Sequence, residues 1–160
     1  MWRGQGPLVN ARPVIRRAQI ADLDTLVAYN LAMARETEGL ELDRAVLRAG
    51  VRAVLEGQRP GLYFVVEERG RVIAQLMITF EWSDWRNRDV WWIQSVYVSA
   101  EARRRGHYAA LYRHVLAEAK EAGAGGVRLY VDRRNTRAQA TYAALGMNGE
   151  HYQVYEAMFT

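Results

Sequence analysis

Three arginines followed by a glycine, Arg103 to Gly106, are the residues of this sequence with the clearest chemical capacity. The apolar run 90–98 before them is typical of a buried strand, and the residues after them repeat with the period of an amphipathic helix. The arginines therefore lie where a strand turns into a helix, whose N-terminus offers unpaired N–H groups and a positive dipole end. Glycine lets a ligand approach the main chain, and the arginines add full charges. This combination predicts a site for a phosphorylated ligand, in particular a pyrophosphate.

Two other phosphate-binding patterns are absent from the sequence. It contains no G-x-x-x-x-G-K-[ST], which argues against a P-loop. It also contains no G-x-G-x-x-G with an acidic residue about 20 positions on, which argues against a dinucleotide-binding fold.

The basic turn resembles motif A of the GNAT acetyltransferases, R/Q-x-x-G-x-G/A, which binds the pyrophosphate of acetyl-coenzyme A. Arg103 occupies the first position and Gly106 the fourth, and Ala110-Leu111 match the pair that often follows. Tyr108 stands where the family usually has glycine or alanine. Its spacing places it on the apolar face of the helix, which would leave the N–H groups of the turn to the phosphate. A ring that points outward would instead crowd the site.

A second segment, residues 135–147, is similar to the GNAT motif N-x-x-A-x-x-x-Y-x-x-x-G-F. Asn135, Tyr142 and Gly146 match this motif, and Met147 replaces its aromatic residue. The two motifs occur in the family's order, with a helix and a strand expected between them. The resemblance extends over roughly residues 14 to 158, nearly the whole chain.

The resemblance implies where the coenzyme binds. Backbone groups of the strand around residues 94–98 would hold the pantetheine arm and the thioester carbonyl, and the basic turn would hold the phosphates. His107 is expected to face solvent beside them, and Asn135 to cap its helix, to contact the coenzyme arm, or both. The predicted coenzyme-binding residues are Val96, Tyr97, Val98, Arg103, Arg104, Arg105, Gly106, His107, Tyr108 and Asn135.

Tyr142 is the predicted catalytic residue, because it matches the tyrosine that in many family members meets the coenzyme sulfur as a general acid. A free tyrosine titrates near pH 10 and a thiol near 8.5, so full proton transfer to the thiolate is uphill by about 2 kcal/mol. We therefore expect Tyr142 chiefly to donate a hydrogen bond. The structural alternative is an aromatic residue packed in the core.

Acidic and aromatic residues in the connections predict that the acceptor is a primary amine which arrives as a cation. The alternative is that the tryptophans form a dimer surface. No general base is assigned; Glu36, Glu38, Glu81 and Asp84 remain candidates. The predicted acceptor-binding residues are Glu36, Glu38, Glu81, Asp84, Trp85, Trp92 and Gln94.

Composition narrows the remaining classes of function. The 160 residues suit a single domain, predicted over residues 13–160 after a loose tail at residues 1–12. The absence of cysteine and the three scattered histidines argue against a metal site. The net charge of +4 comes from dispersed arginines, so no nucleic-acid partner is expected. No apolar stretch approaches 18 residues and no signal-peptide core is present, which predicts a cytoplasmic protein without a membrane partner.

The expected elements follow the order βααβββαβαβ. One helix is expected from Asp22, and a second one, with Asp43 as its N-cap, is expected to turn Val46, Leu47, Val51, Val54 and Leu55 inward. Arg69-Gly70 marks a hairpin between two apolar runs, and a short strand is expected at 129–131 and a final one at 152–159. This order gives an α/β protein with a mixed sheet and helices on both faces, and the resemblance implies the GNAT fold, whose central sheet is mixed and mostly antiparallel.

We therefore expect an N-acetyltransferase that moves an acetyl group from acetyl-CoA to a primary amine of a small molecule or peptide by direct attack. The alternative is a GNAT-like module that binds an acyl-CoA or senses a ligand without turnover. A homodimer remains possible, and the fold does not identify the acceptor.

Overall fold

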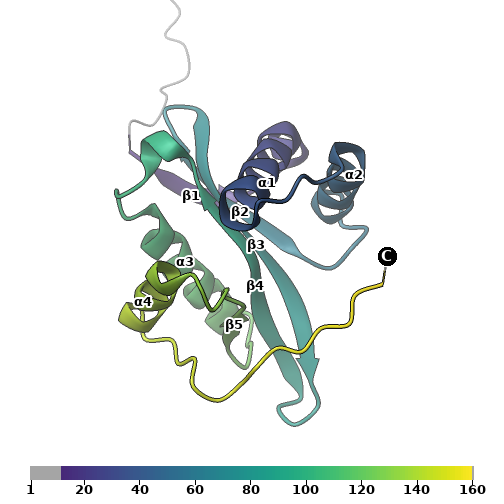
Figure 1. Cartoon of the computed structure of the whole chain (residues 1–160), viewed down its shortest axis with the longest axis vertical. Helices are drawn as coiled ribbons and strands as arrows, with labels where there is room; N and C mark the ends of the chain where they lie inside the picture. Colours follow the sequence, from purple (N-terminus) through teal and green to yellow (C-terminus); the bar gives the residue numbers. More distant parts are fainter. Residues whose placement is uncertain (1–11, 160) are drawn as a thin grey trace, which may run out of the picture. The chain divides into compact units, whose positions relative to one another are not determined.

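The computed structural model describes residues 12–159 (Figure 1). They divide after Leu129 into two compact units. The predicted tail at residues 1–12 lies outside the described residues, apart from Arg12. The first unit contains β1 (Val14–Arg17), α1 (Leu23–Glu38), α2 (Arg44–Leu55), β2 (Leu62–Glu68), β3 (Arg71–Ser83), β4 (Arg88–Val98), α3 (His107–Glu121) and β5 (Val127–Leu129), and the second contains α4 (Thr136–Ala144).

A five-stranded sheet in the order β1-β2-β3-β4-β5 forms the centre of the first unit. The first three pairings are antiparallel, and only β4 and β5 run parallel, because α3 connects them as a crossover. The mixed, mostly antiparallel sheet expected from the sequence is therefore confirmed.

Four consecutive residues of β2, Tyr63 to Val66, are buried although their side chains point alternately to opposite faces, because helices cover both faces of this sheet (Figure 1). Tyr63 and Val65 join the core formed with α1 and α2. Phe64, between them, points to the opposite face, where its ring lies 5.3 Å from that of His114 in α3. Each strand in the middle of the sheet is thus buried on both faces, which explains its nearly continuous apolar sequence.

Local signals in the sequence fix the ends of several elements. The Asp43 carboxylate accepts hydrogen bonds from the N–H groups of Ala45 and Val46, at 2.8 and 3.0 Å, and so caps α2 as predicted. Arg69 and Gly70 have φ of 51° and 73°, the two left-handed residues of a tight hairpin turn between β2 and β3.

Three details of the expected fold are wrong. Residues 152–159 form no strand; Val154 and Tyr155 there are 55% and 90% exposed. Their apolar composition suits a strand, but a strand also needs a partner, which composition does not reveal. The short strand after α3 lies at Val127–Leu129, two residues earlier than expected, in register with Trp91–Ile93. Val46, expected to point inward from α2, is 70% exposed, and only Val51 of that helix is fully buried.

Candidate active site

The turn between β4 and α3 has a backbone suited to an anion. A short 3₁₀ helix, Ala100–Ala102, follows β4, and Arg104 and Gly106 then adopt left-handed conformations with φ of 62° and 80°. Gly106 is the N-cap of α3, and no side chain caps this end. A Cβ built on Gly106 would meet no protein atom within 4 Å, so the main chain there is open to a ligand. An uncapped helix N-terminus behind an open glycine is the arrangement that phosphate groups use.

The three arginines of this turn are not equivalent. Arg103 pairs with Glu36 of α1 at 2.5 Å, and Arg105 binds Glu68 of β2 through two hydrogen bonds of 3.0 and 2.5 Å. These hydrogen bonds raise the pKa of both guanidinium groups, and that from Arg105 lowers the pKa of Glu68. Arg104 is exposed and has no ion pair within residues 12–159. The Arg104 side chain can therefore turn towards a phosphate without breaking an ion pair, whereas Arg103 and Arg105 would each have to leave a carboxylate.

His107 does not face solvent, which corrects the expectation from the sequence. It is only 6% exposed, and its Nε2 is buried without a hydrogen-bond partner among the described residues. Burial, and then the charge of Arg105, lower the pKa of His107. Its spacing of four with Leu111 and eight with Val115 puts it on the buried stripe of α3, a position that the motif comparison did not reveal.

Tyr108 is half-buried, and its hydroxyl oxygen is enclosed by the protein. The ring thus points inward, as its spacing predicted, and does not stand over the turn. The substitution of the family's small residue by tyrosine therefore leaves the backbone of the turn open.

The strand before the turn parts from its neighbour where the coenzyme arm was expected. β4 pairs with β5 only over Trp91–Ile93. In the pairing of β4 with β3, Met77 lies opposite Ser95 and Ile78 opposite Ile93, so Gln94 is an extra, bulged residue. Beyond it, Val96, Tyr97 and Val98 have no strand partner on the β5 side among the described residues. Their backbone groups on that side can bind an extended ligand.

The predicted acceptor residues fall into three separate groups. Glu36 lies at the end of α1, where one oxygen accepts from Tyr97 Oη at 3.1 Å and the other from Arg103. Glu81 accepts a hydrogen bond from the Trp92 indole and lies 3.7 Å from Arg128, and Gln94 donates to Thr79 Oγ1 at 2.6 Å. Asp84 and Trp85 occupy the β3–β4 hairpin, where Trp85 is 91% exposed. Glu38 is exposed.

Sequence reasoning missed two residues of this region. Glu68 was assigned only to a strand, although it binds Arg105. Gln75, which is completely buried, donates from Nε2 to Ser95 Oγ at 3.5 Å beside the bulge. A glutamine amide inside the run 72–80, where Thr79 is the other polar residue, is the signal that could have marked it.

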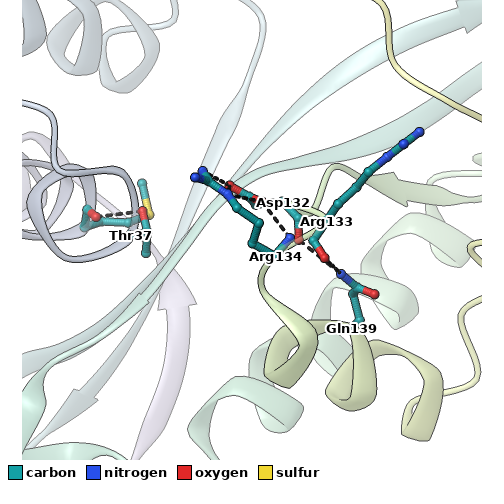
Figure 2. A network of polar contacts seen from close by, with 6 residues as sticks. Thr37, Asp132, Arg133, Arg134 and Gln139 are labelled. Carbon is teal, nitrogen blue, oxygen red and sulfur yellow. Dashed lines mark hydrogen bonds and ion pairs between the residues drawn. The ribbon is translucent and has the colours of Figure 1, made fainter.

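In the second unit, Asn135 caps α4 by accepting from the Ala138 N–H at 3.0 Å. Gln139 of this helix donates to the backbone oxygens of Asp132 and Arg133 at 3.1 and 2.9 Å, and the Arg134 side chain closes on Asp132 (Figure 2). These contacts fix the loop before α4. The cap role of Asn135 is thus confirmed, whereas its coenzyme contact stays a prediction.

The end of α4 explains the glycine of the second motif. Gly146 has φ of 86°, and the N–H groups of Gly146 and Met147 donate to the carbonyls of Ala143 and Tyr142, both at 3.0 Å. This pair of bonds is a Schellman motif, which requires a left-handed residue. Tyr142 is half-buried, and no residue of α4 is fully buried, so Tyr142 is not enclosed in a core.

Residues 12–159 contain no group of three or more histidine and acidic side chains placed to hold a metal. None of their helices has the length and apolar character needed to cross a membrane.

The sheet order, the helices on both faces and the open glycine turn after β4 agree with the fold expected from the sequence. The model of the acetyltransferase (GNAT) family matches residues 26–147, and the chain belongs to this family.

Solved structures agree with this assignment. A possible acetyltransferase from Clostridium difficile 630 is 44% identical, with 92% of this chain and 98% of that chain covered and a TM-score of 0.87. The aminoglycoside N-acetyltransferase AAC(6')-Iy in complex with CoA shares the fold at 15% identity, with 96% and 99% covered and a TM-score of 0.77. The same enzyme with the bisubstrate analogue CoA-S-monomethyl-acetylneamine is 15% identical, with 93% of this chain and 99% of that chain covered and a TM-score of 0.76. No curated protein sequence matches the chain.

Proposed function

We propose that this protein is an N-acetyltransferase that transfers the acetyl group of acetyl-CoA to a primary amine of a small-molecule or peptide acceptor. The observation that carries the proposal is the turn at Arg103–Gly106, where an uncapped helix and an open glycine meet exposed Arg104. The CoA and bisubstrate complexes of the related fold support acetyl-CoA as donor and an amine as acceptor.

The described residues offer contacts to two parts of the coenzyme, its pyrophosphate and its pantetheine arm. The pyrophosphate would lie against the backbone N–H groups at the start of α3, with the charge of Arg104 beside it. The pantetheine arm would lie along Val96–Val98, whose backbone on the β5 side has no strand partner among the described residues. The thioester then supplies the activated acetyl group for transfer.

Direct transfer requires three steps of this site. The acceptor must lose its proton, because only a neutral amine is nucleophilic. Its nitrogen then attacks the carbonyl carbon, so that a C–N bond forms and the C–S bond breaks, while the nitrogen gives up a second proton to solvent and the departing sulfur finally takes one up to become the free thiol. The sulfur leaves as a thiolate, which the Tyr142 hydroxyl would stabilise by donating a hydrogen bond. Exact placement of the two reactants would supply much of the remaining rate acceleration.

The acceptor surface we propose is acidic and aromatic. Glu81 and the Trp92 ring are adjacent on β3 and β4, and Glu38 is exposed in the last turn of α1. Carboxylates beside an indole attract an ammonium group by charge and by cation–π contact. Glu36 is a poor candidate for the base, since both its oxygens already accept hydrogen bonds.

The test is release of free thiol from acetyl-CoA in the presence of a panel of primary amines, with mass spectrometry of the acetylated product. The proposal expects amine-dependent thiol release that matches the product one to one. Neutral alcohols of similar shape serve as the control acceptors. Tight binding of CoA without turnover of any amine would instead support the module that binds an acyl-CoA without catalysis.

A further inference from the structure

One arginine of the turn before α3, Arg103, is held by residues of α1 and β4. Arg103 donates to the Glu36 carboxylate at 2.5 Å and to the backbone oxygen of Val98 at 3.1 Å. Its guanidinium also lies over the Tyr97 ring, 5.4 Å from the centroid. Carboxylate, carbonyl and ring therefore fix this side chain from three sides.

The partners of Arg103 lie at the end of α1 and on β4, and Glu36 shares its helical turn with Glu38, which we proposed to face the acceptor. Tyr97 is 9% exposed, donates from its hydroxyl to Glu36 at 3.1 Å, and packs on Tyr29 of α1 with 5.0 Å between ring centroids. Burial, and then the bond to Glu36, raise the pKa of Tyr97, which keeps its hydroxyl protonated as a donor. We call Glu36, Tyr97 and Arg103 the clamp, because together they tie the last turn of α1 to the end of β4.

The position of Glu36 is unfavourable for α1 by itself. Glu36 lies in the last turn of the helix, where the negative end of the dipole disfavours a carboxylate. Arg103 compensates this charge from a distant part of the chain. An arginine used in this way has a role different from that of Arg104, which has no carboxylate partner among the described residues.

We propose that Arg103 is a positioning residue for the acceptor, which acts through Glu36 on the connection after α1, and is not a ligand of the coenzyme phosphates. The proposal rests on the proposed function, in which acetyl-CoA and the amine would bind on opposite sides of Arg103. The first arginine of the motif would then hold the connection after α1 in place, where the sequence predicted that it binds the phosphates.

Calorimetric titration with coenzyme A separates the two roles. Arg103→Gln should leave the dissociation constant within about twofold of wild type, whereas the matched control Arg104→Gln should raise it about fivefold or more. The opposite order, with Arg103→Gln as the more damaging change, would overturn the proposal.

Hydrogen exchange reports on the clamp without any need for activity. The amides of Gly39 and Leu40 donate to Arg35 and Ala34 at 3.1 Å and close the end of α1. Their exchange should rise about three- to fivefold in Glu36→Gln, in Arg103→Gln and in the double variant alike, and not in Arg104→Gln. Unchanged exchange in the single variants, or effects that multiply in the double variant, would contradict the clamp.

Kinetics with the best amine of the panel complete the test. Arg103→Gln and Glu36→Gln should raise the KM for the amine by similar factors and leave the KM for acetyl-CoA unchanged. Equal changes in both KM values would defeat a role specific to the acceptor. If wild-type protein releases no thiol, the proposed function fails, while the exchange experiment still decides whether the clamp exists.

Discussion

Replacing Gly106 by alanine separates the cost to the fold from the cost to the ligand. Gly106 has φ of 80°, and a Cβ there would meet no protein atom within 4 Å, so backbone strain is the only penalty to folding. A residue with a Cβ loses about 1–2 kcal/mol in the left-handed region. For a domain of this size that loss lowers Tm by about 3 to 6 °C.

Gly123, just beyond the other end of α3, provides a matched control. Its φ is 73°, and a Cβ there would also meet no protein atom within 4 Å. Gly123→Ala should therefore show the same loss of Tm. The two variants differ only in what the new methyl group faces, because the coenzyme phosphates are proposed to approach Gly106 alone.

The coenzyme affinity should thus fall only in Gly106→Ala. A methyl group that prevents one charge-assisted hydrogen bond removes about 1.5–3 kcal/mol, which raises the dissociation constant about 10- to 100-fold. Thermal unfolding and calorimetric titration with coenzyme A measure the two effects. Equal coenzyme affinities in Gly106→Ala and Gly123→Ala would refute the placement of the phosphates at this turn.

Three further changes test the fold and the chemistry. Arg16→Ala should cost about 2 kcal/mol in urea unfolding, because it removes the bidentate partner, at 2.8 and 2.9 Å, of buried Asp22, and Arg16→Lys should recover part of the loss. Burial lowers the pKa of His107 below its usual value of 6.5, so the folded protein binds a proton at this side chain less readily than the unfolded chain does. Stability should therefore fall as the pH drops below about 6.5, and His107→Asn should flatten the fall between pH 7 and 5 in urea midpoints; an unaltered profile would show that another group causes it. Tyr142→Phe should lower kcat roughly ten- to a thousand-fold at constant Tm, and an active but unstable variant would make Tyr142 a packing residue.

Local patterns in the sequence predicted most of the fold. The hairpin at Arg69-Gly70 and the cap at Asp43 depend on residues that are neighbours in the chain, and both occur as expected. The inward direction of Tyr108 followed from helical spacing alone. The prediction of a final strand was wrong because a strand needs a partner far away in the sequence, and the apolar residues at 152–159 do not specify such a partner.

The sequence predicted which backbone segments form the candidate site, but only part of the side-chain contacts within it. The turn at Gly106 and the strand that parts from its neighbour after Ile93 follow from the position of the motif. The partners of the arginines do not, because Glu36 and Glu68 approach from other elements, 67 and 37 residues away in the chain. A charge run predicts an anion site but not which of its members is already neutralised.

A crystal structure of the protein with acetyl-CoA would show which residues hold each part of the coenzyme. We expect the pyrophosphate to lie against the backbone at Gly106 and the start of α3, with Arg104 turned towards it, Arg103 still paired with Glu36, and the pantetheine arm along Val96–Val98. Coenzyme bound elsewhere on the protein, or a pyrophosphate held by Arg103 with Glu36 released, would contradict this expectation.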